Sequence, residues 1–271
     1  MSAPPRLFDR GLHRKRLDRA APGFADAGFL KHRAAADLVE RLEAIVRNFP
    51  LAVDLGARDG AFAAALARSP ARKRIGLLIE TDLSAAMLGG RASLRVRMDE
   101  EELAFADASL DLVVSSLALH WVNDLPGCLI QVRRALKPDG LFMAALLGGE
   151  TLGELRTALM QAEAEILGGA AAHISPAVDA REALGLMQRA GFLFPVTDVD
   201  RVNVRYPHPL RLLADLRAMG ETSAFSDREG PRLTRRTLAR AFEIYQEQFA
   251  DPDGRATATF DIVTLTGWAP G

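Results

Sequence analysis

The feature that most constrains this chain is a regular alternation of short apolar runs and amphipathic segments. Apolar runs predict strands at 51–55, 74–79, 94–98, 110–115 and 141–147, and helical spacing predicts helices at 61–68, 85–88, 125–136 and 152–167. Strands that alternate with helices in this way form a mostly parallel sheet with helices on both faces, joined by right-handed crossovers. The sequence therefore predicts an α/β fold.

The segments on either side of this alternation complete the predicted fold. Apolar residues recur at helical spacing over residues 6–47, so we expect an N-terminal helical segment within residues 1–50. After residue 170, a helix at 179–190 precedes strands at 197–206 and 257–268, and helices at 209–220 and 234–249 lie between those strands. We therefore expect residues 51–271 to form a domain with a seven-stranded sheet, in which a helical insertion at about 206–256 covers one end.

Charge and cysteine content narrow the class of protein. The 34 Lys and Arg residues balance 35 Asp and Glu residues, and the resulting net charge of -1 argues against nucleic-acid binding. Basic clusters at 10–19 and 232–240 are interpreted first as solvated helix faces and second as docking surfaces for peripheral association with a partner. The single cysteine, Cys128, excludes a disulfide framework within the chain. The first ten residues carry no secretory signal and no apolar run approaches the roughly 20 residues that span a bilayer, so we expect a cytoplasmic protein without a transmembrane segment.

The first predicted strand leads into a glycine turn, Val53-Asp54-Leu55-Gly56-Ala57-Arg58-Asp59-Gly60, which opens the next helix. Glycine lets a backbone approach a ligand closely, and the N-terminus of a helix presents free N–H groups. We therefore predict that Gly56 and Gly60 shape a ligand site, and that Asp54 orients a ligand ammonium. The alternative is a tight strand-to-helix turn that holds no ligand.

Acidic residues follow the second and third predicted strands. Asp82, with Glu80 as the alternate, lies roughly 20 or more residues past the glycine turn, where open α/β sheets place an acid that binds ribose hydroxyls. Asp82 could also cap a helix. Asp99 and Glu100 follow the third strand and could accept the amino group of an adenine, or they belong to a solvated acidic turn. Because the carboxyl ends of neighbouring strands face one crevice, these signals support one another.

Polar residues also follow the fourth predicted strand, which ends at Ser115 and Ser116. His120, shortly after them, is a candidate general base that would meet a substrate. Alternatively, His120 and Trp121 begin a helix and pack on the nucleoside. No metal site is evident, since none of the five histidines stands in a His-x-Asp or His-x-Glu pair.

Several of these segments together match a known family. They are Asp54-Leu55-Gly56 with Gly60, Asp82-Leu83-Ser84, Asp99-Glu100, Leu110-Asp111-Leu112-Val113 and Leu136-Lys137-Pro138-Asp139-Gly140. They resemble the class I S-adenosylmethionine-dependent methyltransferases. The resemblance implies S-adenosylmethionine as the cofactor, and His120 remains the candidate catalytic residue. It also implies a cofactor pocket formed by Asp54, Gly56, Arg58, Gly60, Asp82, Asp99, Glu100 and Ser115.

Longer segments, some of them outside this pocket, resemble a narrower family. They include Phe8-Asp9-Arg10, Arg47-Asn48-Phe49-Pro50-Leu51, Leu119-His120-Trp121-Val122-Asn123-Asp124, Gly148-Gly149-Glu150-Thr151-Leu152-Gly153-Glu154, His173-Ile174-Ser175-Pro176 and Met219-Gly220-Glu221. They are similar to the mitochondrial complex I assembly factor described as an arginine hydroxylase, and to its bacterial relatives. That resemblance implies modification of an arginine of the quinone-proximal iron–sulfur subunit of complex I. A weaker resemblance, mainly over residues 6–145, to the malonyl-carrier-protein methyltransferase of biotin synthesis implies methyl transfer to a small or carrier-bound acid instead.

One residue departs from the family pattern. The family turn reads Asp-x-Gly-x-Gly-x-Gly, and Arg58 stands at its middle glycine. A β-carbon is unfavourable where a backbone must approach a ligand closely. The Arg58 side chain could pair with the methionine carboxylate of the cofactor, or it could fill the pocket. The second outcome would favour a third function, that of a non-catalytic assembly chaperone.

Overall fold

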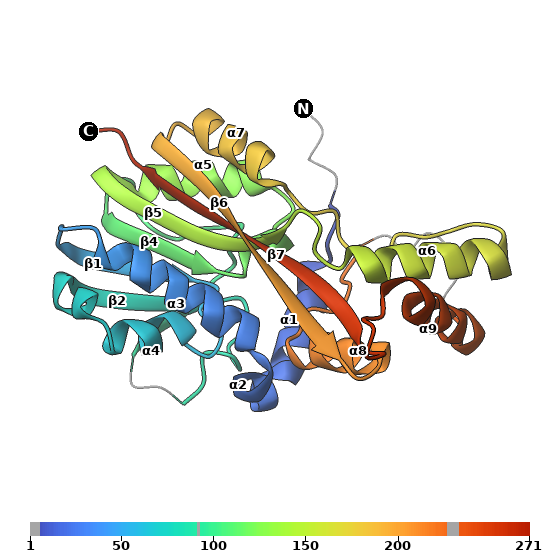
Figure 1. The fold of residues 1–271 in the computed structure, drawn as a ribbon. Coiled ribbons are helices and arrows are strands. Elements are labelled where there is room, and N and C mark those ends of the chain that lie inside the picture. The colour runs from blue at the N-terminus through green and yellow to red at the C-terminus, as the bar shows by residue number, and fades with distance from the viewer. Residues whose placement is uncertain (1–5, 91–92, 227–232) are drawn as a thin grey trace.

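The centre of the molecule is a seven-stranded sheet with the strand order β3-β2-β1-β4-β5-β7-β6 (Figure 1). The computed structural model describes residues 6–90, 93–226 and 233–271. Its parallel strands are β1 (Phe49–Leu55), β2 (Ile75–Asp82), β3 (Leu94–Arg97), β4 (Leu110–Ser116) and β5 (Leu136–Gly148). The last strand, β7 (Ala256–Trp268), is antiparallel to both β5 and β6 (Leu193–Tyr206). The predicted mostly parallel α/β sheet is confirmed.

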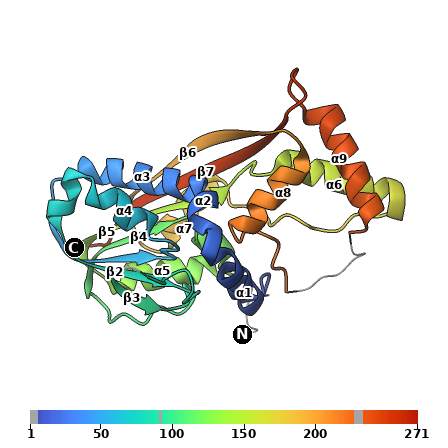
Figure 2. The same ribbon diagram turned by 90° about the horizontal axis from the view of Figure 1, so that it is seen from below.

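Helices cover both faces of the sheet (Figures 1 and 2). On one face α3 (Phe29–Glu43) and α4 (Ala61–Ala67) share a core with the apolar side chains of β1, β4 and β5. On the other face α5 (Leu125–Ala135) and α7 (Ala180–Arg189) pack on the alternate residues of the same strands. Successive residues of a strand point to opposite faces, so strands buried on both faces consist of continuous apolar runs. This explains why the apolar runs predicted these strands well.

The N-terminal helices lie near the carboxyl ends of the parallel strands. The first, α1 (Arg10–Ala20), is followed by a short 3-10 turn (Ala21–Gly23) and by α2 (Phe24–Ala27). Figure 2 shows α1 and α2 beside the central strands, between these strands and α8. Two further 3-10 turns, Pro70–Arg74 and Leu119–Trp121, precede β2 and follow β4. The predicted N-terminal helices are therefore present and lie close to the crevice formed by the strand ends.

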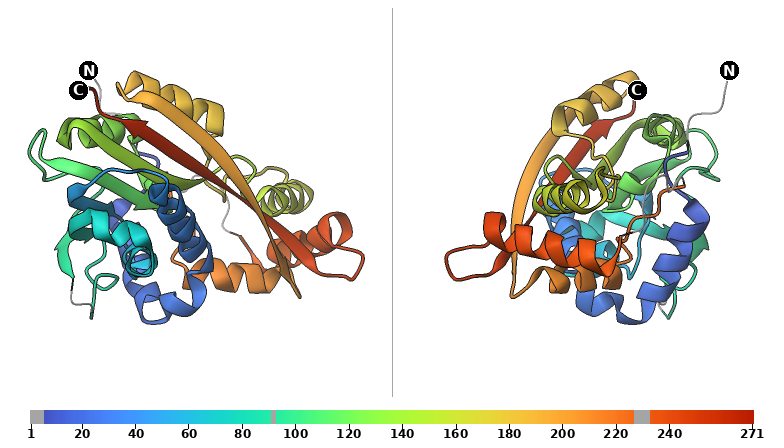
Figure 3. Two further views of the ribbon diagram at one scale, coloured as in Figure 1. Left: turned by 60° about the vertical axis from the view of Figure 1, so that its left-hand side comes forward. Right: turned by 90° about the vertical axis from the view of Figure 1, so that its right-hand side faces the viewer.

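The predicted insertion between the last two strands is also present. It contains α8 (Pro209–Ala218) and α9 (Arg235–Phe249), and α9 packs against α6 (Gly153–Leu167). The strands β6 and β7 extend beyond the rest of the sheet to reach these helices (Figure 3). No helix within the described residues is both long enough and apolar enough to cross a membrane.

One predicted helix is wrong. Residues 85–90 form turns, so no helix follows β2 directly in the part of this segment that the structure describes. The Ser84 hydroxyl accepts a hydrogen bond from the Met87 backbone N–H at 3.1 Å, which closes one turn. Gly89 and Gly90 follow at once, and Gly90 has a φ of 78°. A single turn fixes many dihedral angles for few hydrogen bonds, so it does not propagate into a helix when glycines follow.

Candidate functional site

The glycine turn after β1 brings the backbone close to two other loops. Gly56 has a φ of 70°, and a β-carbon there would lie 2.2 Å from Cβ of Ala118 and 3.2 Å from Oε1 of Glu100. Gly60 has a φ of 80°, and its N–H donates to the Ala57 carbonyl at 2.9 Å just before α4 begins. Both positions need the left-handed backbone conformation that glycine adopts without a penalty. The turn therefore packs tightly against Ala118 and Glu100, and a side chain at residue 56 would not fit there.

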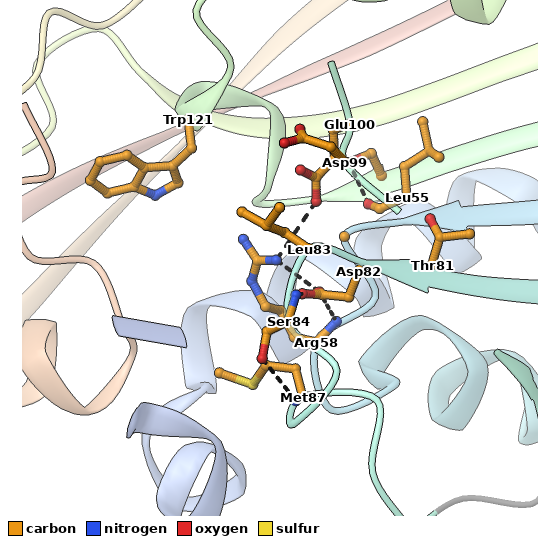
Figure 4. A network of polar contacts seen from close by, with 12 residues as sticks. Leu55, Arg58, Thr81, Asp82, Leu83, Ser84, Met87, Asp99, Glu100 and Trp121 are labelled. Atoms are coloured by element: carbon orange, nitrogen blue, oxygen red, sulfur yellow. Dashed lines mark hydrogen bonds and ion pairs between the residues drawn. The ribbon is translucent and has the colours of Figure 1, made fainter. Parts of the chain in front are cut away.

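Arg58 lies inside this crevice and is 2% exposed. Its backbone has a φ of 52°, a left-handed conformation that side-chain-bearing residues adopt at a cost. Its Nη1 lies 2.8 Å from Oδ2 of Asp82 and 3.9 Å from Oε1 of Glu100 (Figure 4). Burial alone would lower the pKa of Arg58, but Asp82 and Glu100 raise it above its ordinary value. The guanidinium is therefore a buried cation held between acids.

Asp82 uses both of its carboxylate oxygens. Oδ1 accepts from the Ser84 N–H at 2.8 Å, and Oδ2 accepts from the Arg58 N–H at 2.9 Å as well as from its guanidinium. The alternative role of Asp82 as a helix N-cap is wrong, because residues 85–90 form turns. Asp82 lies at the carboxyl end of β2, in the place expected for an acid that binds ribose.

Asp99 and Glu100 lie across the crevice from Asp82, and Arg10 of α1 contacts both. The Arg10 Nη2 lies 2.6 Å from Oδ1 of Asp99 and also donates to Oε2 of Glu100, and its Nη1 donates to the Trp121 carbonyl at 3.1 Å. Burial raises the pKa of Glu100 even though Arg10 and Arg58 act to lower it. Oε1 of Glu100 is buried and has no hydrogen-bond partner among the described residues.

These contacts correct two interpretations from the sequence. The side chain of Glu100 is 2% exposed, so this acid does not belong to a solvated turn. The side chain of Arg10 is 12% exposed, so the basic cluster of α1 is not simply a solvated helix face. Both corrections have one cause: α1 docks on the loop after β3, and a contact between residues so far apart in the chain has no local sequence signal.

Lys31 is a further buried cation at the site, and the sequence analysis missed it. Its ammonium donates to the Gly56 carbonyl at 2.8 Å and to the Ser116 hydroxyl at 2.9 Å. Burial lowers the pKa of Lys31 to about 8, and the Asp54 carboxylate opposes this shift. Asp54, predicted to orient a ligand ammonium, thus stabilises the charge of an internal one. The sequence feature that could have indicated a buried lysine is its place on the apolar face of a helix, one turn from Ala34 and Ala35.

Ser115, also predicted to bind the cofactor, makes a contact within the sheet. Its hydroxyl donates to the Leu55 carbonyl at 2.8 Å, and the side chain is completely buried. This bond ties the end of β4 to the end of β1. Ser115 therefore positions the glycine turn.

His120 and Trp121 lie in the 3-10 turn Leu119–Trp121, in agreement with the local structure that one of the two predictions gave them. Its Nε2 lies 3.0 Å from Oε2 of Glu221, and the Trp121 indole N–H donates to the same oxygen at 2.7 Å. Burial alone would raise the pKa of Glu221, but His120 and Arg58 lower it below its ordinary value. On the other side of the Trp121 ring, the buried ring of His13 stacks at a centroid distance of 4.4 Å.

His120 and Glu221 line a cavity of about 290 Å³ beneath the C-terminal insertion. Its remaining walls are mostly aliphatic and come from β5, α6 and α8 and from the segment before α7, among them Leu147, Leu152, Leu155, Leu159, Ile174, Pro176, Leu213 and Leu216. No Lys or Arg lines this cavity among the residues that the structure describes. At its far side His173 Nε2 lies 2.6 Å from Oε1 of the buried Glu163. Glu221 had no predicted role, although it belongs to Met219-Gly220-Glu221, one of the segments that resemble the narrower family.

A smaller cavity lies next to this one and shares Leu147, Leu216 and Glu221 with it. Arg58 and Lys31 line the smaller cavity. The crevice at the glycine turn and the apolar cavity are therefore neighbours, with Glu221 between them. No group of three or more His, Cys, Asp or Glu side chains that could hold a metal ion occurs in residues 6–90, 93–226 and 233–271.

Comparisons with known proteins agree with this architecture. Residues 53–144 match the family model described as a methyltransferase domain. The YcgJ protein from Bacillus subtilis superposes with a TM-score of 0.60 at 14% identity, over 89% of this chain and 99% of that one. Phosphoethanolamine N-methyltransferase 2 of Haemonchus contortus, solved in complex with S-adenosyl-L-methionine, superposes with a TM-score of 0.50 at 16% identity, over 88% of this chain and 52% of that one. The fold is that of the class I methyltransferases.

Relatives of known name define the family more closely. The chain is 38% identical to the mitochondrial arginine-hydroxylase NDUFAF5 of Danio rerio, over 97% of this chain and 83% of that protein. It is 39% identical to the human protein of the same name, over 97% and 76%. The malonyl-[acyl-carrier protein] O-methyltransferase of Halorhodospira halophila is 33% identical over 97% and 89%. The chain belongs to the family of the arginine-hydroxylase NDUFAF5 within the methyltransferase superfamily.

Proposed function

We propose that this protein modifies an arginine side chain of the quinone-proximal iron–sulfur subunit during assembly of respiratory complex I. The observation that carries the proposal is the cavity beneath the insertion. Its aliphatic walls suit the methylene chain of an arginine, and the Glu221 carboxylate suits the guanidinium, because planar guanidinium groups pair with carboxylates through two N–H donors. The relatives named arginine-hydroxylase, which match 97% of this chain, support the same substrate.

The cofactor part of the proposal places S-adenosylmethionine in the crevice at the strand ends. When bound, this cofactor supplies an electrophilic methyl group. The residues fit it in chemical type: Gly56 provides a backbone surface, Asp82 an acceptor for ribose hydroxyls, and Glu100 a buried Oε1 without a hydrogen-bond partner. Asp54, Gly60 and Asp99 complete the crevice, while Ser115 holds it in shape.

His120 is the proposed catalytic residue. Glu221 accepts a hydrogen bond from Nε2, which orients the ring, and Nδ1 is buried without a hydrogen-bond partner among the described residues. A histidine held in this way can accept or return a proton at Nδ1 when a substrate approaches from the cavity. The proposed location is cytoplasmic and the proposed association is peripheral, since an assembly factor must reach its subunit before the membrane complex is complete.

Two other functions have specific support. Methyl transfer to a malonyl carrier protein is supported by relatives of that name at 33% identity. The malonyl carboxylate is anionic, however, and no Lys or Arg among the described residues lines the cavity to receive it. A non-catalytic assembly chaperone is supported by Arg58, whose guanidinium occupies the ribose acceptor.

Mass spectrometry of the iron–sulfur subunit separates these functions. The subunit is purified from the source organism, from a strain that lacks this protein, and from strains complemented with wild type, Glu221→Gln or Glu243→Gln. Wild type should change the mass of one arginine. One added methylene would indicate transfer of the S-adenosylmethionine methyl group to a guanidinium nitrogen, which loses a proton, and one added oxygen atom would indicate hydroxylation with molecular oxygen and two electrons from an external reductant. Glu221→Gln should reduce modification at least tenfold because it removes the charge that holds the guanidinium, as expected for a charge-assisted pair.

Glu243→Gln is the matched control, because Glu243 is exposed on α9. It should leave modification unchanged. An arginine that is unmodified both with and without the protein would contradict the proposed enzyme. If complex I still failed to assemble without the protein, the chaperone function would replace it.

A further inference from the structure

Arg58 occupies the carboxylate that the fold provides for a ribose. Its backbone N–H and its guanidinium both donate to Oδ2 of Asp82, at 2.9 Å and 2.8 Å, and the Ser84 N–H donates to Oδ1 at 2.8 Å. Two adjacent N–H donors present a carboxylate with the same pattern that two ribose hydroxyls would. A nucleoside and the guanidinium therefore need the same acceptor.

We propose that Arg58 is an internal competitor of the nucleoside, which binds only after the guanidinium has left Asp82. The inference rests on the cofactor part of the proposed function and is independent of arginine modification. It assigns to a single residue the control of cofactor affinity in this chain.

The backbone of Arg58 supports this assignment. Its φ of 52° lies in the left-handed region, which residues with a β-carbon adopt at a cost in free energy. The side chain is also 2% exposed, so the cation has lost its hydration. A strained and desolvated residue stays in place only when its surroundings compensate, and Asp82 and Glu100 are the acids around its guanidinium. In this structure the Asp82 carboxylate, which would accept the ribose hydroxyls, therefore holds the Arg58 guanidinium.

The guanidinium also has a further acid on the side toward the substrate cavity. Arg58 lines the smaller cavity together with Glu221, on the side toward the substrate cavity. Glu221 is one of the acids that raise the pKa of Arg58, so a carboxylate also lies on that side. A displaced guanidinium would therefore still face a carboxylate, that of Glu221, in a cavity whose other walls are mostly apolar.

Calorimetric titration with two probes tests the competition. S-adenosylhomocysteine carries an amino-acid tail with a carboxylate, and adenosine carries the same ribose and base without the tail. If Arg58 competes with the ribose, Arg58→Gly should strengthen the binding of both probes at least tenfold. If Arg58 instead pairs with the tail, Arg58→Gly should weaken S-adenosylhomocysteine and leave adenosine unchanged, and this result would overturn the proposal. Unchanged affinity for both probes would overturn it as well.

Two further variants complete the test. In the Arg58→Gly background, Asp82→Asn should abolish the gain for both probes, and a gain that persists would show that the competition does not involve Asp82. Asp139→Gly is the matched control, because Asp139 also has a positive φ, 57°, but lies near the start of β5, at the opposite end of the strand from the crevice. It should leave both affinities within twofold. If Arg58→Gly does not fold, as judged by circular dichroism, Arg58→Ala keeps the β-carbon and serves in its place with the same expected direction.

Discussion

At the scale of single residues, the site depends on cations that the protein itself supplies to its buried acids. Lys31, Arg58 and Arg10 come from α3, from the glycine turn and from α1, and each lies against a carboxylate or a carbonyl at the strand ends. Buried charges persist only when they are paired and hydrogen-bonded. These three cations therefore offset much of the negative charge of the crevice before any ligand enters.

The buried ammonium of Lys31 should make stability depend on pH in the alkaline range. Burial lowers the pKa of Lys31 from 10.5 to about 8, so between these values the unfolded chain binds a proton that the folded chain does not. Stability therefore rises as pH increases from about 8 to about 10.5, by up to about 3 kcal/mol. Urea titration at several pH values measures the free energy of unfolding of wild type and of Lys31→Met. After the pH dependence common to both proteins is subtracted, only wild type should show this rise.

Lys137→Met is the matched control for this measurement, because the Lys137 side chain is 41% exposed and pairs with Asp111 on the surface. This variant should keep the wild-type slope between pH 8 and 10.5. A Lys31→Met protein with the same slope as wild type would show that Lys31 is not a desolvated cation in the folded protein.

The ion pairs of Arg10 should contribute more to the free energy of unfolding than an exposed ion pair does. Its side chain is 12% exposed and contacts Asp99 and the buried Glu100. Removal of one member of a buried pair leaves an uncompensated charge, so Arg10→Met should lower the free energy of unfolding by about 3 kcal/mol. Arg134→Met breaks an exposed pair with Asp107 and should cost less than about 1 kcal/mol. Urea titration measures the free energy of unfolding of both variants. Equal losses of stability would show that burial does not strengthen the contribution of Arg10.

A double-mutant cycle assigns the loss to Glu100. If Arg10 chiefly neutralises this acid, Arg10→Met should cost clearly less in a Glu100→Gln background, because no buried charge is then left without a partner. An unchanged cost would mean that Arg10 acts through Asp99 or the Trp121 carbonyl instead.

At the scale of elements, local sequence patterns predicted most of the fold. The strands and long helices agree with the structure because apolar runs and helical spacing are decided by residues close together in the chain. The exception, residues 85–90, is short and glycine-rich, and there one side-chain hydrogen bond from Met87 to Ser84 decided the conformation. Short segments have weak periodic signals, so their state depends on single contacts.

The site was predictable only in part, for a related reason. Gly56, Gly60, Asp82 and Asp99 lie at strand ends, and topology alone brings strand ends together. Arg10, Lys31 and Glu221 arrive from α1, α3 and the loop after α8, and nothing in the local sequence specifies which loop they contact. The position of a helix over a crevice is set by packing between distant segments.

A prediction at this scale concerns the N-terminus of α7, which directly follows a segment of the cavity wall. The helix begins with a capping box, in which Asp179 accepts from the Glu182 N–H at 2.8 Å and Glu182 accepts from the Asp179 N–H at 3.2 Å. Loss of a capping side chain costs about 1 kcal/mol. Asp179→Ala should lower the free energy of unfolding by that amount in urea titration. Asp107→Ala, at an exposed position outside any helix, should change it by less than about 0.5 kcal/mol, and equal effects would show that the cap is not formed.

At the scale of the whole molecule, two sites share one end of the sheet. The parallel strands end in the polar crevice, and β6 and β7 extend past them to carry α8 and α9 over an apolar cavity (Figure 3). Glu221 lies between the two, and it lines both cavities. A reactive group held in the crevice and a side chain held in the cavity would therefore meet near Glu221 and His120, which agrees with a transfer or modification reaction on a bound side chain.

A variant that fills the cavity tests whether the space beneath the insertion binds a substrate or is only a packing defect. Leu213 of α8 lines the cavity of about 290 Å³, so Leu213→Phe places extra apolar volume in existing space. Filling a cavity adds contacts without strain, so the free energy of unfolding should stay equal or rise by up to about 1 kcal/mol. Arginine modification of the iron–sulfur subunit should nevertheless fall at least tenfold, because the substrate side chain loses its place. Leu210→Phe, on the same helix but 58% exposed, should change neither quantity. Full modification by a stable Leu213→Phe protein would show that the substrate enters elsewhere.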